Sequence, residues 1–276
     1  MRILLMRAWH QGETAVQQRA GYHRNGGVGV RLPDAARDFL AQRQTIILGG
    51  RDLSGRVWAG ALYGPQGFLQ ANNQNLITLD VVPDESDPLR LALRHQADVG
   101  AIAIEPQTRR RMRVNGRLHD LGDHLVIEPD QVFANCPKYI AETPLGATDT
   151  GYERDWSTEL SLAQQAFIAT IDTFFVASHV DGHGADASHR GGQIRVTGPK
   201  TLSWPDYRGN AMFMTLGNLE LDPACGLFIP DRVNGEHLRL TGTARVDWDP
   251  AAAATFEGAE RVVHFDVSDV VQSRRP

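Results

Sequence analysis

The chain has 276 residues, 42% of them hydrophobic and 22% charged, which is the balance of a soluble globular protein with one or two domains. Its formal net charge of −5 argues against a broad basic face for nucleic acid but not against a local anion pocket. No window approaches the roughly 18 uncharged apolar residues of a membrane span. The apolar run after Arg2 is too short for a signal peptide. We therefore expect a cytoplasmic protein with no membrane or nucleic-acid partner.

The residue pattern predicts a mainly β fold with a few helices. Twenty-seven glycines and many short apolar runs broken by Gly, Asn, Asp or Pro are typical of strands joined by turns. The predicted strands are 46–50, 57–62, 99–105, 111–118 and 124–128, then one carrying 188–190, then 201–204. Apolar residues at three- and four-residue steps predict helices over 34–44, 87–96, 158–167 and 209–222, two of them preceded by Asp or Thr as the N-cap.

Short internal matches indicate that the chain contains two related halves. The matched pairs are Gly100 with Gly226, Arg113 with Arg239, and Gly116 with Gly242, each 126 residues apart. The segment 40–42, Leu-Ala-Gln, also recurs as 162–164, only 122 residues further on. The change of spacing predicts extra residues in the second half, in the Gly/His/Asp-rich stretch 178–189. The order helix–strand–strand–helix–strand–strand is the same in both halves.

The matches favour a duplicated small β-barrel. We expect an N-terminal half over 1–145 with a degenerate site and a C-terminal half over 158–276 that carries the binding motifs. The connector, roughly 141–157, is rich in Thr, Gly, Pro and Asp. Two fused copies of a barrel that forms symmetric dimers would give the same dimer within one chain, with a ligand cleft between the copies.

The densest polar and glycine-rich segment is 185–218. A strand there carries Ser188 and Arg190, a turn is predicted at 205–207, and Gly209-Asn210 is predicted to open a helix. Unpaired N–H groups at a helix N-terminus stabilise an anion, and an arginine adds a bidentate contact. From the residues alone, two interpretations stay open: a phosphomonoester site, or a capped helix beside a polar surface strand.

The motifs of this segment are ADASHRGG (185–192) and WPDYRGNAMFMTLGN (204–218), followed by LRLTGTARV (238–246). Together with GETAVQQRAG (12–21) and NCPKYI (135–140), they resemble the pyridoxamine 5′-phosphate oxidase-like family of FMN-binding split β-barrels. More narrowly, they resemble its flavin-nucleotide-binding subgroup. The resemblance implies two tandem split β-barrels that form a pseudo-dimer within the chain, with FMN held non-covalently between them.

The same resemblance implies a set of FMN-binding residues: Ser188, His189, Arg190, Trp204, Asp206, Gly209, Asn210 and Asn218. For Asn218, a purely structural role is the alternative to FMN binding. The chain departs from the family's pattern at Ala211, at Met214 and in the shortened segment 193–194. These departures are expected to affect how firmly FMN is held. One site per chain is expected, because 58–64 has no arginine where the second half has the SHRGG motif.

The implied function is an FMN-dependent oxidoreductase, in which the flavin carries the two-electron transfer. Its partners would be a small-molecule substrate and an electron donor, with NADH, NADPH and a partner reductase all open, as is a homodimer. No catalytic residue is assigned, although His189 is the candidate for proton transfer because its ordinary pKa is near neutrality. The alternatives are a non-catalytic flavin- or haem-binding module and a metal-dependent hydrolase using the histidines of 179–189.

Three further features have a structural and a functional interpretation. Cys136 and Lys138 either line a flavin pocket, or Cys136 is simply packed and Lys138 simply faces solvent. The basic run 109–113 is expected to be a solvated strand face. The two cysteines, Cys136 and Cys225, are too few for a disulfide framework or a four-sulfur zinc site.

Overall fold

The computed structural model describes residues 9–22, 27–94, 96–134, 140, 152–209, 211–232 and 234–274. Its helices are α1 (Gln11–Arg19), α2 (Asp34–Ala41), α3 (Pro88–Ala92), α4 (Leu162–Ile168), α5 (Met214–Leu221) and α6 (Pro250–Ala253). The strands of the first half are β1 (Thr45–Arg51), β2 (Val57–Tyr63), β3 (Leu69–Asn73), β4 (Leu76–Leu79), β5 (Gln96–Glu105), β6 (Arg110–Asp120) and β7 (Leu125–Ala134). Those that follow are β8 (Glu153–Ser157), β9 (Thr173–Val180), β10 (Gly184–Gly191), β11 (Arg195–Gly198), β12 (Thr201–Tyr207), β13 (Ala224–Pro230), β14 (His237–Asp247) and β15 (Ala259–Arg274).

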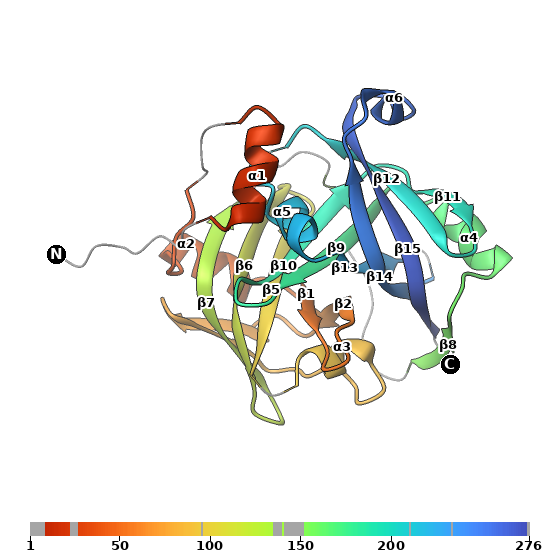
Figure 1. The fold of residues 1–276 in the computed structure, drawn as a ribbon. Helices are drawn as coiled ribbons and strands as arrows, with labels where there is room; N and C mark the ends of the chain where they lie inside the picture. Colours follow the sequence, from red (N-terminus) through yellow and green to blue (C-terminus); the bar gives the residue numbers. More distant parts are fainter. Residues whose placement is uncertain are drawn as a thin grey trace.

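The strands form two antiparallel sheets with the same strand order. The first sheet runs β2-β1-β5-β6-β7-β4-β3 and the second β10-β9-β13-β14-β15-β12-β11, so each strand of the second is eight places later in the chain than its counterpart. A helix precedes the first strand of each sheet, and another lies between the fourth and fifth strands. β8, from the expected connector, pairs with β15. The prediction of a mainly β fold with few helices is confirmed (Figure 1).

Most predicted elements are present, with several corrections at their ends. Residues 205–207 belong to β12 and are not a turn, because they continue the pairing with β15. The helix predicted over 209–222 begins only at Met214. Of the predicted 87–96, only α3 is helical, and Asp87 caps it as expected by accepting a hydrogen bond from the Leu89 N–H. Among the described residues, no helix is long or apolar enough to cross a membrane.

The glycines matched by the sequence repeat occupy equivalent places in the two sheets. Gly116 follows a register shift between β6 and β7, and Gly242 follows one between β14 and β15. A Cβ at Gly116 would collide with the carbonyl oxygen of Glu128, and one at Gly242 with that of Asp266. Both bulges therefore require glycine because a backbone carbonyl fills the space of the side chain.

The Leu-Ala-Gln match does not join equivalent residues, and the expected place of the extra residues is wrong. Leu40 is buried at the end of α2, whereas Leu162 is 84% exposed at the start of α4. The residue of α4 that is buried like Leu40 is Ile168, immediately before the β9 segment. The second half is longer between β14 and β15, where α6 is inserted, and not in 178–189.

Each sheet has its own hydrophobic core, and a third core joins the two. The strands β1, β2 and β5 lie against β9, β10 and β13 in the middle of the molecule (Figure 1). This shared core consists of Ile47, Val57, Ala59, Ala61 and Ile102 from the first sheet and Phe175, Ala177, Ala187 and Phe228 from the second. The halves are therefore joined by buried apolar surface.

The matched glycines also set how closely the sheets approach. A Cβ at Gly100 of β5 would collide with the backbone of Asp186 and Ala187 in β10. A Cβ at Gly226 of β13 would lie 2.5 Å from the carbonyl oxygen of Val57 in β2. Each sheet thus has one glycine, at corresponding positions of β5 and β13, that lies directly against the backbone of the other sheet.

Candidate anion and cofactor site between the sheets

A small cavity of about 110 Å³ lies between β6 of the first sheet and β10, β12 and α5 of the second. Its polar lining includes Arg111, Arg113, Ser188, His189, Arg190, Asp206 and Thr215. Because β6 and β10 belong to different sheets, neither half forms this cavity alone. Three of the lining residues are arginines, so the cavity favours the binding of a negatively charged group.

Arg113 is a buried cation with incomplete hydrogen bonding. Its guanidinium forms an ion pair with Asp186, which also accepts hydrogen bonds from Asn115 Nδ2 (3.2 Å) and Thr215 Oγ1 (2.7 Å). Burial lowers the pKa of Arg113, and the attraction of Asp186 only partly offsets it. Its Nε is buried and makes no hydrogen bond with any described residue. Such a donor stabilises an acceptor placed in the cavity.

Arg190 lines the same cavity as Arg113. Its Nη1 donates to Asp206 Oδ1 (2.7 Å), and the other oxygen of Asp206 accepts from Arg261 Nε (2.9 Å). The Nε of Arg190 is also buried without a hydrogen bond to the part of the chain that the structure describes. Asp206 therefore orients Arg190 at the wall of the cavity, and the Arg190 Nε stays unsatisfied in the described structure.

The hydroxyl of Ser188 and the first turn of α5 complete the cavity. Thr215 Oγ1, whose single proton is donated to Asp186, lies 2.9 Å from Ser188 Oγ, and Met214, Thr215 and Leu216 line the same space. The helix was predicted to start at Gly209-Asn210, and this is wrong, because Ala211 (φ 61°) and Phe213 (φ 51°) have left-handed backbone conformations. A helix N-terminus does line the site, but it begins at Met214 and not at the predicted position 209.

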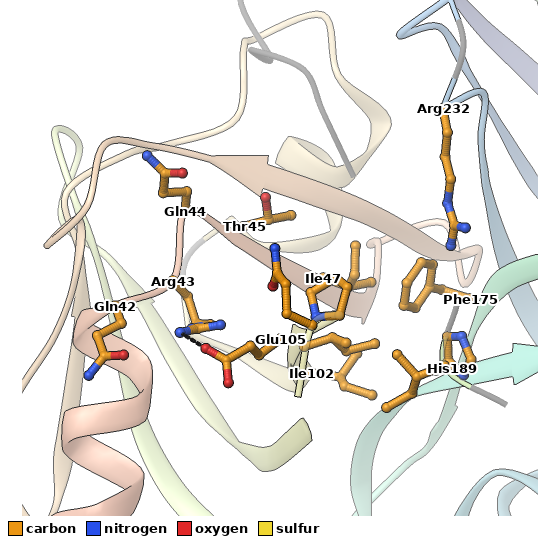
Figure 2. Close-up of a pocket in the computed structure, with 14 residues that line it drawn as sticks. Gln42, Arg43, Gln44, Thr45, Ile47, Ile102, Glu105, Phe175, His189 and Arg232 are labelled. Atoms are coloured by element: carbon orange, nitrogen blue, oxygen red, sulfur yellow. Dashed lines mark hydrogen bonds and ion pairs between the residues drawn. The ribbon is translucent and has the colours of Figure 1, made fainter. Parts of the chain in front are cut away.

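A larger cavity of about 310 Å³ adjoins the small one, and His189 lines both. Figure 2 shows Ile47, Ile102 and Phe175 on one side, with the Arg232 guanidinium directed toward Phe175 and His189. At the other end, Arg43 forms an ion pair with Glu105. An apolar wall with a few polar groups is typical of a cofactor pocket.

His189 is a neutral imidazole at neutral pH. Burial lowers its pKa to about 3, and the positive charges of Arg111, Arg232 and Arg190 add to the shift. Its ring packs edge-on against Phe175, with 5.5 Å between the centroids. The sequence-based reason for choosing His189 as a proton-transfer group, an ordinary pKa near neutrality, is therefore wrong in the folded chain.

The structure brings most of the predicted site residues together. Ser188, His189, Arg190, Asp206 and Gly209 line the small cavity, as do the departures Ala211 and Met214. Trp204 does not line it, since it is buried in the second core against Phe174. Asn210 lies outside the described residues, as do Cys136 and Lys138.

Asn218 has structural contacts in place of the predicted contact with the cavity. Its Nδ2 donates to Ser178 Oγ (3.0 Å), and its Oδ1 lies 2.9 Å from His10 Nε2. His10 caps α1, which packs on α5 (Figure 1). Asn218 therefore connects α1, α5 and β9, in agreement with the structural alternative.

Sequence reasoning missed Arg111 and Arg113, which were expected on a solvated face. That expectation is wrong because β6 faces β10 here, so Arg113 is only 5% exposed. The signal that could have found it is the repeat itself, which matched Arg113 with Arg239. Arg239 is equally buried on β14 and also reaches the other half, where it pairs with Asp87 (2.7 Å).

The counterpart position around Arg239 is filled by the chain itself. The fully buried Asp87 carboxylate forms an ion pair with Arg239 and accepts hydrogen bonds from Arg154 Nη2 (3.1 Å) and from the Leu89 N–H (2.8 Å). Gly60 lies in β2 where Ser188 lies in β10, and a Cβ there would be 2.8 Å from Arg239 Nε. No open cavity around Arg239 matches the one around Arg113 among the described cavities.

The histidines of 179–189 do not converge on one point. His179 Nε2 lies 3.0 Å from Asp98 Oδ2, His183 packs against the ring of His10, and His189 lies between the two cavities. The described residues contain no group of three or more potential His, Cys, Asp or Glu ligands. The geometry thus gives no support to the hydrolase alternative.

Acidification is expected to destabilise the protein partly through His189. Its pKa is about 3 when folded and near 6.5 when unfolded, so between these values the unfolded chain binds the extra proton. The free energy of unfolding therefore falls with pH below about 6.5, by about 2 kcal/mol per such histidine between pH 7 and 5. His237, whose pKa burial also lowers well below its usual range, adds to the fall.

Urea unfolding at pH 7 and pH 5 measures this effect. His189→Gln should make the decline about 2 kcal/mol smaller, because glutamine does not titrate. His124→Gln, at a partly exposed histidine in the turn between β6 and β7, is the matched control and should behave like the wild type. An equal decline in all three proteins would contradict the assignment.

Comparisons with known proteins give weak structural neighbours. No family model matches the chain, and no curated protein matches it. One similar solved structure is a putative pyridoxamine 5′-phosphate oxidase from Lactobacillus delbrueckii (19% identity, TM-score 0.35, covering 41% of this chain and 94% of that one). Others are HupZ of Group A Streptococcus (18%, 0.33, 40% and 92%) and the FAD binding protein from Mycobacterium smegmatis (16%, 0.32, 44% and 100%). Likenesses with TM-scores of this size do not assign the chain to a family.

Proposed function

We propose that this protein is a flavoprotein that binds one FMN non-covalently in the two adjoining cavities between its sheets. The proposal includes the architecture behind the site: two tandem split β-barrels, 1–145 and 158–276, arranged as a pseudo-dimer within one chain. The identical strand orders and the corresponding glycine contacts of Gly100 and Gly226 support this duplication. The family motifs around 185–218 support the choice of FMN.

The observation that carries the proposal is the pair of buried guanidinium donors. Arg113 and Arg190 both line one cavity, and the Nε atom of each is buried without a hydrogen-bond partner among the described residues. A phosphate group supplies the oxygen acceptors and the negative charge that such donors require. We expect Ser188, Arg111 and the first turn of α5 to contact the same phosphate.

The larger cavity suits the remainder of the cofactor. Its apolar side, Ile47, Ile102 and Phe175, fits one face of a planar ring, and its volume lies at the lower end of the range for ligand pockets. When bound, the flavin supplies two-electron transfer chemistry. The protein's own residues bind the phosphate, orient the ring and exclude water. His189, being neutral, contributes a hydrogen bond and not a proton.

The activity proposed for this site is an oxidoreductase of the pyridoxamine 5′-phosphate oxidase-like type. It would act on a small-molecule substrate, with NADH, NADPH or a partner reductase as the electron donor. A bound flavin that none of these donors reduces would instead indicate a non-catalytic flavin- or haem-binding module. Association into a homodimer is compatible with one site per chain, because both walls of the site come from the same chain.

Removal of the Arg190 side chain is expected to weaken FMN binding by about 10- to 100-fold, the value of a charge-assisted hydrogen bond. Titration of Arg190→Met with FMN, followed by flavin fluorescence, measures the change. Riboflavin, which has no phosphate, should bind the variant and the wild type equally well. Arg195→Met, which removes an exposed arginine of β11 outside both cavities, is the control and should bind FMN normally.

Two outcomes would count against the proposal. A wild-type protein that binds neither FMN nor riboflavin would overturn the flavin assignment. An Arg190→Met variant that loses riboflavin and FMN in the same proportion would show that Arg190 does not contact the phosphate.

A further inference from the structure

A third cavity, of about 610 Å³, lies in the first half, outside the two cavities assigned to FMN. It is bounded by α2, by the start of β6 and by the end of β7. Residues 27–33 form another wall, held to β7 by the Gly29 N–H, which donates to the Val132 carbonyl (2.9 Å). Arg111 is the only residue it shares with the small cavity. We refer to it as the arginine-rimmed cavity.

The floor of the arginine-rimmed cavity is apolar. Phe39, Met112, Val132 and Phe133 are all buried side chains of this floor, and Ala36 of α2 is partly exposed beside them. Such a surface binds the apolar body of a ligand, because its burial releases ordered water from both partners.

The rim is strongly positive. Arg31, Arg109, Arg110 and Arg111 all line it, and the described lining residues include no Asp or Glu. The guanidinium of Arg110 lies 5.2 Å from the centre of the Phe39 ring, which holds its charge at the edge of the apolar floor. In a protein of net charge −5, this gathering of positive charge is a local property of the cavity.

We propose that the arginine-rimmed cavity is a second ligand site, specific for an organic anion with an apolar body, such as an aromatic or medium-chain carboxylate. The floor and the rim each select one part of this ligand. A neutral apolar molecule leaves the arginines unused, and a small inorganic anion leaves the floor unfilled. The site is distinct from that of FMN, since its floor lies on α2, β6 and β7 of the first half alone.

Binding of 8-anilinonaphthalene-1-sulfonate, an aromatic anion whose fluorescence rises in apolar sites, tests the proposal. The native protein should bind one molecule per chain at this cavity. Arg110→Glu should weaken binding by about tenfold or more, because it replaces an attractive charge by a repulsive one. Ala36→Phe should abolish binding by filling the cavity. The matched controls are Arg117→Glu on the same strand and Ala41→Phe on the same helix, and both should bind normally.

Competition then defines the ligand class. Decanoate should displace the probe at least tenfold more effectively than decanol, which has the same chain and no charge. Equal displacement by decanol would contradict the requirement for an anion. The site would be overturned if Arg110→Glu and Ala36→Phe both still bound the probe as the wild type does. It would also be overturned if one equivalent of FMN displaced the probe. Because FMN binding is measured separately, and both variants should retain it, failure here is distinguishable from failure of the proposed function.

Discussion

Replacing Arg113 by methionine is expected to lower the free energy of unfolding by about 3–5 kcal/mol, the usual cost of removing one partner from a buried ion pair. Asp186, only 1% exposed, would lose its ion-pair partner and keep the neutral donors Asn115 and Thr215. Because Arg113 belongs to β6 and Asp186 to β10, the loss should also weaken the contact between the two sheets.

Chemical denaturation at pH 7 measures the loss. Arg117→Met, at a half-exposed arginine of the same strand, should change stability by less than 1 kcal/mol and serves as the control. The double variant Arg113→Met/Asp186→Leu should recover part of the loss, because it no longer buries an uncompensated carboxylate. A single variant within 1 kcal/mol of the wild type would show that the pair contributes little.

Replacing Gly100 by alanine is expected to cost about 3 kcal/mol or more, at or above the upper end of the usual range for overpacking. The new methyl group would collide with the backbone of Asp186 and Ala187, which belong to a buried strand and cannot move aside as a flexible side chain could. The strain would therefore be relieved only by separating β5 from β10. That separation would widen the junction on which the candidate site is built.

Thermal or urea unfolding checks this prediction, with FMN binding as a second readout. Gly27→Ala is the matched control, since a Cβ there would meet no atom within 4 Å, and it should leave both quantities unchanged. If Gly100→Ala proved as stable as Gly27→Ala, the close approach of the sheets described here would be wrong.

The local pattern of the sequence predicted the elements well and their ends less well. Runs such as 46–50 and 57–62 are strands because their apolar residues are buried on both faces, which gives a continuous signal. The start of α5 could not be predicted from such a pattern of apolar residues. It depends on the left-handed conformations of Ala211 and Phe213, which residues of these types rarely adopt.

For the site, the sequence predicted the residues of one strand and missed those of the other. Ser188, His189 and Arg190 are adjacent in the chain and belong to the SHRGG segment, so one segment was enough to find them. Arg113 meets them only because two sheets pack together, which depends on contacts distant in sequence. The pKa of His189 likewise depends first on its burial and then on charges that include Arg111 and Arg232, both distant from it in sequence.

The Asp87 carboxylate beside Arg239 has a consequence for the ligand binding proposed above. A tethered anion of this kind cannot dissociate or be diluted, so it competes at a fixed and very high effective concentration. Ligand titrations should then follow a simple hyperbola with one step, without the cooperativity that two equivalent sites could show. Arg113 also has a buried partner, Asp186, so the equivalence is broken by what surrounds each pair: at Arg239 the aspartate also caps α3, and Gly60 stands where the other position has Ser188.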